Sequence, residues 1–136
     1  VKAIDVAGAG GTSWSQVEMH RIKEQHLSHV AEAFRTWGIP TAESIKQVKR
    51  VCPDLVIFGS GGLRTGIDVA KCIALGTVLG GMAAPFLEAV ITSREKLFQK
   101  IEEINREIRL SMFMIGAGNI DELRHTPMLR SDSGGE

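Results

Sequence analysis

The sequence GSGGLRTG, at residues 59–66, lies between the apolar run LVIF at 55–58 and the helix-like segment IDVAKCIAL at 67–75. Glycines let backbone approach a ligand closely, and the first N–H groups of a helix have no partner within that helix. The helix dipole favours an anion at this end, and a phosphate suits such a corner best. A plain strand-to-helix turn has the same composition, and on one glycine turn alone it is the favoured interpretation.

A second corner of the same kind follows in VLGGMAAPFL, at residues 78–87. It has the pattern of a strand, small residues and a helix start, with Pro85 suited to the first helical turn. In a barrel of alternating strands and helices, the loops after the seventh and eighth strands often hold a phosphate jointly. Both corners together therefore favour a phosphate site over two plain turns.

The rest of the chain repeats the order of strand and helix. Strands are predicted over 1–7, 55–58 and 77–83. Helices are predicted over 22–34, 42–51, 65–75, 85–91 and from 92 onward. The pattern at 15–20 does not show whether that segment is helical. Continuous apolar strands are typical of a parallel sheet covered on both faces, so we expect an α/β fold with right-handed crossovers.

Three helix ends carry local signals. Thr41 is predicted as the N-cap of the helix over 42–51, with Ile45 and Val48 facing inward. The sequence TSRE at 92–95 is typical of a capping box opening a long amphipathic helix, for which packing is favoured over a self-association surface. Asn119 can cap a short helix over 120–124, and we expect residues 131–136 to be a disordered tail after a domain over 1–130.

Composition excludes several classes of protein. The 136 residues are 43% apolar and 24% charged with zero formal net charge, which gives no support for nucleic acid or an acidic membrane as a partner. Apolar runs fall short of the roughly 20 residues that span a bilayer, and no targeting signal is visible. Two cysteines without a motif indicate a reducing, cytoplasmic setting.

The chain starts at Val1 within a predicted strand, so we expect a fragment of a longer protein.

Side chains outside the two corners give only weak signals for a metal or catalytic site. Three histidines lie close in sequence, but a zinc site needs further ligands, so surface histidines are favoured over a metal site. They are His20, His26 and His29. Glu18 and Arg21 have the spacing of a surface or interface ion pair.

Three other side chains have an ambiguous or structural reading. Asp5 is predicted to be buried in its strand, where a structural anchor is favoured over a place in the site. Cys72 is expected to be inert within its helix, and Arg64 could hold a phosphate or pair with a carboxylate. No nucleophile with a base and no paired carboxylates stand out, so no catalytic residue is assigned, and a cofactor would carry demanding chemistry.

Three motifs occur in one order: IDVAGAGGTSW at 4–14, WGIPT at 37–41 and SGGLRTGIDVAK at 60–71. Together they resemble type 2 isopentenyl diphosphate isomerase, an FMN-dependent TIM-barrel family. The resemblance runs from Val1 to about Leu129 and matches the C-terminal part of that family. It implies a partial (β/α)8 barrel with parallel strands six to eight, their helices and a long C-terminal helix.

The resemblance also implies a function. The family interconverts isopentenyl and dimethylallyl diphosphate with reduced FMN, NADPH as the reductant and Mg²⁺ at the substrate diphosphate. Carried over by motif, the cofactor-binding residues are Thr12, Gly61, Gly62, Leu63, Arg64, Ala83 and Ala84. Ala7 departs from the serine of many relatives, and the family's substrate and metal motifs would lie upstream of Val1.

These departures imply a chain that is inactive alone and binds FMN weakly at best. Three parallel strands leave both edges of the sheet open, and we expect self-association as a homo-oligomer, the long C-terminal helix or a missing half of the barrel to cover them. Another FMN or phosphate-binding barrel, such as a 2-hydroxy-acid oxidase or inosine monophosphate dehydrogenase, is the alternative enzyme. A half-barrel that only assembles, without catalysis, is the alternative from a different class.

Overall fold

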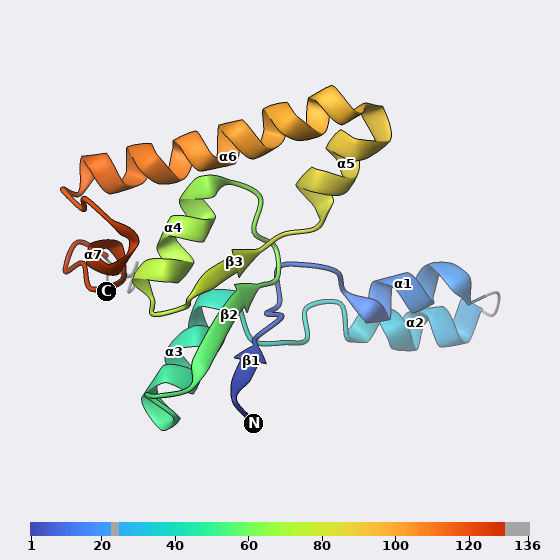
Figure 1. Ribbon diagram of the computed structural model, residues 1–136. Helices are drawn as coiled ribbons and strands as arrows, with labels where there is room; N and C mark the ends of the chain where they lie inside the picture. The colour runs from blue at the N-terminus through green and yellow to red at the C-terminus, as the bar shows by residue number, and fades with distance from the viewer. Residues whose placement is uncertain (23–24, 130–136) are drawn as a thin grey trace, which may run out of the picture.

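The computed structural model describes residues 1–22 and 25–129 (Figure 1). Its strands are β1 (Ala3–Asp5), β2 (Val56–Ser60) and β3 (Leu79–Gly81). Its helices are α1 (Trp14–Arg21), α2 (Gln25–Ala33), α3 (Thr41–Val51), α4 (Gly66–Ala74), α5 (Ala84–Thr92), α6 (Arg94–Met114) and α7 (Ile120–Arg124). The predicted tail at 131–136 lies outside the described residues, as do residues 23–24 of the helix predicted over 22–34.

The three strands form one parallel sheet in the order β1-β2-β3. Ile4 aligns with Ile57, and Gly59 aligns with Gly80. Parallel neighbours joined through helices are the repeating unit of a (β/α)8 barrel, and the chain forms part of such a barrel. All three carboxyl ends therefore lie at the same edge of the sheet, which is where the loops that we singled out begin.

Two of the strands are shorter than the sequence predicts. β1 stops at Asp5, because Ala7 has a φ of 40° and leaves the extended conformation. β3 covers only Leu79–Gly81 of the predicted 77–83. The loops that follow the strands are correspondingly longer, and they form the rim of the site.

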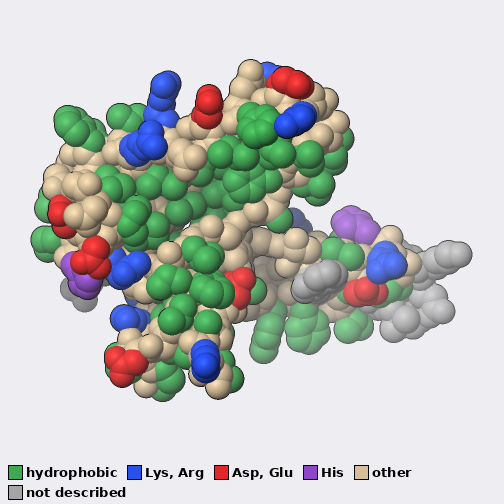
Figure 2. Space-filling view, viewed as in Figure 1, with side chains coloured by type: hydrophobic (Ala, Val, Ile, Leu, Met, Phe, Trp, Pro, Cys, Tyr) green, Lys and Arg blue, Asp and Glu red, His purple; other side chains and the backbone are tan. Residues whose placement is uncertain are grey.

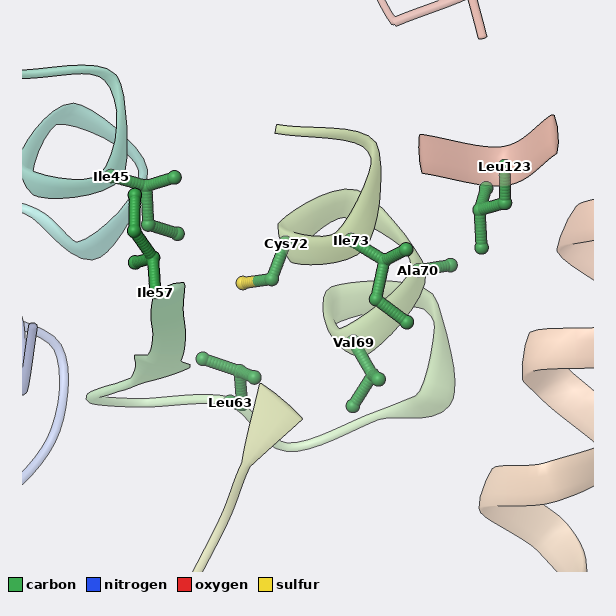
Figure 3. Packing of buried hydrophobic residues seen from close by; sticks show 8 residues of the cluster. All are labelled: Ile45, Ile57, Leu63, Val69, Ala70, Cys72, Ile73 and Leu123. Atoms are coloured by element: carbon green, nitrogen blue, oxygen red, sulfur yellow. The ribbon is translucent and has the colours of Figure 1, made fainter. Parts of the chain in front are cut away.

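The core lies between the sheet and the helices α3 and α4. Ile45 of α3 and Ile57 of β2 are fully buried and lie next to each other in Figure 3. Burying each of these side chains contributes about 1.5–3 kcal/mol. Val69 and Ile73 extend the core along α4, which packs against β3 on one side and α6 on the other.

The long helix α6 begins one residue later than the predicted capping box. Ser93 is the N-cap, and its hydroxyl accepts a hydrogen bond from the Lys96 amide at 3.1 Å. Thr92 instead ends α5 by donating its hydroxyl to the Glu88 carbonyl at 3.0 Å. The short helix α7 follows the prediction, because Asn119 caps it by accepting from the Glu122 amide at 2.9 Å.

The helices α1 and α2 pack on each other as a hairpin that projects from the sheet (Figure 1). The segment 15–20, which the sequence pattern left undecided, is helical within α1. Phe34 and Trp37 follow α2 and meet edge to face with ring centroids 5.6 Å apart. No helix among the described residues is long and apolar enough to cross a membrane.

Candidate anion-binding site

A cavity of about 640 Å³ opens at the carboxyl ends of the three strands. The surface is hollowed between α5 and the α1–α2 hairpin in Figure 2. The loops after β1, β2 and β3 each contribute to the wall. The predicted site residues all line it: Thr12, Gly61, Gly62, Leu63, Arg64, Ala83 and Ala84.

The N-terminus of α4 is closed by the protein's own carboxylates. Asp68 Oδ2 accepts hydrogen bonds from the Arg64 and Thr65 amides, both at 3.0 Å. Glu107 of α6 accepts from the Gly66 amide at 2.5 Å. The expectation that the first amides of this helix point unpaired at a ligand is therefore wrong.

The closure at Asp68 is a capping box. Thr65 Oγ1 accepts from the Asp68 amide at 3.2 Å, while the Asp68 carboxylate binds the Thr65 amide in return. The sequence TGID at 65–68 has the spacing of this motif, so the box was detectable before the structure. Burial alone raises the pKa of Asp68, but hydrogen bonds from Arg64 and Thr65 outweigh it and hold this pKa below its usual 3.8.

The amides that remain for an anion are those of the glycine turn itself. Among the described residues, the N–H groups of Gly61, Gly62 and Leu63 have no hydrogen-bond partner. Gly61 has a φ of 105° and Gly62 a φ of 81°. Successive N–H groups in such a turn form a concave anion-binding nest.

The open helix end at the cavity belongs to α5. Its N-cap, Ala83, offers no side-chain hydrogen bond, and its first turn holds no acidic residue. The amides of Ala83 and Ala84 have no partner within the described part of the chain. Pro85 follows at the start of the helix, where its missing N–H costs nothing.

Gly61 and Gly62 need to be glycines because the loop after β1 lies directly against their backbone. A Cβ on Gly61 would overlap the backbone of Gly8, and a Cβ on Gly62 would overlap the backbone of Gly10. Gly11 is tightly packed without an overlap, since its Cβ would lie 3.2 Å from Gly61 Cα. The loop 8–13 therefore packs directly on the glycine turn and brings Thr12 to the cavity.

Asp5 is exposed, contrary to the expectation of a buried strand residue. The reason is that β1 is an edge of this sheet, with a neighbour on one side only. Its Oδ1 accepts from the Ser60 hydroxyl at 2.5 Å and from the Ala7 amide at 3.2 Å. Asp5 therefore joins the ends of β1 and β2 below the cavity, a role for Ser60 that the sequence did not reveal.

Arg64 carries the charge of the cavity wall. Its side chain is exposed and has no carboxylate within ion-pair distance among the described residues, which leaves its guanidinium free for a ligand. Glu18 and Arg21 form an exposed ion pair at 3.8 Å, away from this wall. Among the side chains that the structure describes, no three His, Cys, Asp or Glu residues form a group that could hold a metal ion.

The family is given by comparison with known proteins. Residues 36–130 match the model of the FMN-dependent dehydrogenases. This match covers most of the chain, and the chain belongs to the FMN-dependent dehydrogenase family.

Two similar curated proteins share one name. An isopentenyl-diphosphate delta-isomerase of Methanocaldococcus jannaschii is 48% identical over 91% of this chain and 34% of its own length. A protein of the same name from Nostoc sp. is 45% identical over 96% of this chain and 37% of its own length. The chain thus spans about a third of these relatives' length.

A solved structure of similar fold is the L230A mutant of flavocytochrome b2 with benzoylformate. It aligns with a TM-score of 0.65 and 25% identity over 96% of this chain and 34% of that one. The alignment supports the partial-barrel architecture that the parallel strands define.

Proposed function

We propose that this chain supplies the FMN phosphate site of an isopentenyl-diphosphate Δ-isomerase, which interconverts isopentenyl and dimethylallyl diphosphate with reduced FMN. The observation that carries the proposal is the convergence of unpaired amides from two adjacent loops on one cavity. Gly61 and Gly62 follow β2, and Ala83 and Ala84 follow β3. The similarity to isomerases of that name, at 48% identity, supports the choice of reaction.

Each wall of the cavity has a part in this proposal. The amides of Gly61, Gly62 and Leu63 would bind phosphate oxygens from one side. The amides of Ala83 and Ala84 would bind from the other, aided by the positive end of the α5 dipole. Arg64 would add a full positive charge, and Thr12 a hydroxyl near the phosphate.

Bound reduced FMN would supply the acid–base chemistry of the isomerisation at its flavin ring. The residues of the cavity wall bind and orient, because Arg64 is the ionisable side chain among them. We therefore propose that the 136 residues do not turn over the substrate alone. NADPH as reductant, Mg²⁺ at the diphosphate, a cytoplasmic location and a homo-oligomer belong to the proposal for the whole enzyme.

A second candidate is another FMN-dependent barrel oxidoreductase, supported by the likeness to flavocytochrome b2. Its 25% identity is about half of the 48% shared with the isomerase, so the isomerase is preferred.

The test is a titration of FMN with the purified chain, followed by quenching of flavin fluorescence. We expect saturable binding with a dissociation constant above about 10 µM, since much of a cofactor's contact surface is missing. Incubation with reduced FMN and isopentenyl diphosphate should give no dimethylallyl diphosphate. No saturable quenching would contradict the phosphate site, while tight stoichiometric binding or turnover would contradict the inactive-chain part.

A further inference from the structure

Thr41 does not cap its helix. α3 starts at Thr41 itself, after Pro40 at the N-cap, and no side chain caps it. The Thr41 hydroxyl instead lies against the glycine turn, 2.6 Å from the Gly61 carbonyl oxygen and 3.2 Å from the Ser60 carbonyl oxygen. A residue predicted to serve its own helix thus holds a loop that is 20 positions away.

These two carbonyls determine where the neighbouring amides point. In a trans peptide the C=O and the following N–H point in opposite directions within one plane. The Ser60 carbonyl also accepts from the Gly8 amide at 2.9 Å, so it faces the β1 side of β2. The Gly61 N–H must then face the opposite side, which is the side of β3.

The same geometry applies one peptide further along the chain. The Gly61 carbonyl faces Thr41, so the Gly62 N–H faces away from Thr41. With φ values of 105° and 81°, the two glycines adopt backbone conformations from which a peptide plane can rotate readily once its carbonyl is released. The position of Thr41 is itself restricted, because Gly8 packs directly on its backbone and Pro40 precedes it.

We propose that Thr41 is a positioning residue of the anion site: its hydroxyl locks the Ser60–Gly61 and Gly61–Gly62 peptide planes so that both glycine N–H groups face the cavity. This inference rests on the proposed function for the identity of the anion, the FMN phosphate. Thr41 is not among the residues that line the cavity. It acts through the orientation of two amides.

The experiment compares FMN with riboflavin, which has the same ring system and no phosphate. Dissociation constants are measured by flavin fluorescence for the unmodified chain, Thr41→Ala, Thr41→Ser and Ser44→Ala. Ser44→Ala is the matched control, because its hydroxyl lies on the same helix and donates to the Ile39 carbonyl instead, at 3.3 Å.

Thr41→Ala should weaken FMN about tenfold, the effect of misaligning one hydrogen bond to a charged group, and leave riboflavin unchanged. Thr41→Ser should restore FMN binding, and Ser44→Ala should have no effect. A general loosening of the fold would weaken both flavins equally and would overturn the inference. Equal FMN affinity in Thr41→Ala and the unmodified chain would also overturn it.

A second measurement needs no ligand. In ¹H–¹⁵N spectra of the free chain, Thr41→Ala should shift the Gly61 and Gly62 amide resonances, and Thr41→Ser should return them. Unchanged resonances would overturn the inference even if the unmodified chain bound no FMN. An unmodified chain that binds no FMN contradicts the proposed function, whereas unchanged amide resonances contradict the role of Thr41. The two failures are therefore distinguishable.

Discussion

Glu107 of α6 accepts a hydrogen bond from the Gly66 amide at 2.5 Å, across 41 positions of sequence. This bond places a carboxylate at the N-terminus of α4, where an anionic ligand would otherwise be attracted. With Asp68 on the two preceding amides, the N-terminus of α4 is bound by two of the protein's own carboxylates. The end of α5 is therefore the helix terminus left for the proposed phosphate.

Glu107→Gln should lower the free energy of unfolding by about 1 kcal/mol, because a charge-assisted hydrogen bond becomes a neutral one. The melting temperature should fall by about 4 °C, measured by circular dichroism. Glu103→Gln is the control, since Glu103 makes an exposed pair with Lys100 at 2.6 Å on the same helix. That variant should change stability little. Equal effects of the two variants would contradict a special role for the Glu107 bond.

Asp68→Asn should also destabilise the chain by about 1 kcal/mol at pH 7, the usual cost of a weakened helix cap. The pKa of Asp68 is lowered from 3.8 in the folded chain, so its stabilisation is fully present above that value. It is lost as the pH falls through the lower folded pKa. Urea unfolding at several pH values should show the two proteins converging below about pH 4. A constant difference down to pH 2 would contradict this origin.

Gly62→Ala should abolish measurable FMN binding, because the φ of 81° disfavours alanine and its Cβ would overlap the Gly10 backbone. Gly116→Ala is the matched control: its φ is 74°, but its Cβ would meet nothing within 4 Å. Both variants should lose about 1–2 kcal/mol from backbone strain. Only Gly62→Ala should lose FMN in fluorescence titration. Equal loss in both would mean that strain, not the shape of the turn, accounts for the effect.

The two free cysteines should differ sharply in reactivity. Cys52 is exposed, whereas burial raises the pKa of the Cys72 thiol to about 11, with a smaller contribution from Asp68. At pH 8, one thiol per chain should react with a thiol reagent in the native state, since the thiolate is the reactive form. Cys52→Ser should remove that reaction, and Cys72→Ser should leave it. Rapid reaction of two thiols in the native chain would contradict the packing around α4.

The sequence predicted whatever depended on neighbouring residues. The βα order, the inward face of α3 with Ile45 and the two glycine- and alanine-rich corners at the cavity follow from local patterns, while the individual cofactor-binding residues came from the family resemblance. The predictions were wrong where residues distant in sequence determine a hydrogen-bond partner or the burial of a side chain. The residues around Gly66 do not indicate that Glu107 will accept a hydrogen bond from its amide. The residues around Thr41 likewise do not indicate that its hydroxyl donates to the distant Gly61 carbonyl and does not cap its own helix. Asp5 was misjudged because an apolar strand does not reveal that it lies at a sheet edge.

The most direct test of the central claim is an FMN titration of the ¹⁵N-labelled chain, observed through its backbone amides. The resonances of Gly61, Gly62 and Leu63 should move together with those of Ala83 and Ala84, and all five should give one dissociation constant. Riboflavin, without the phosphate, should leave these resonances in place. Shifts that spare either loop, or that appear first at Gly66 and Asp68 on α4, would contradict a phosphate held jointly between the ends of β2 and β3.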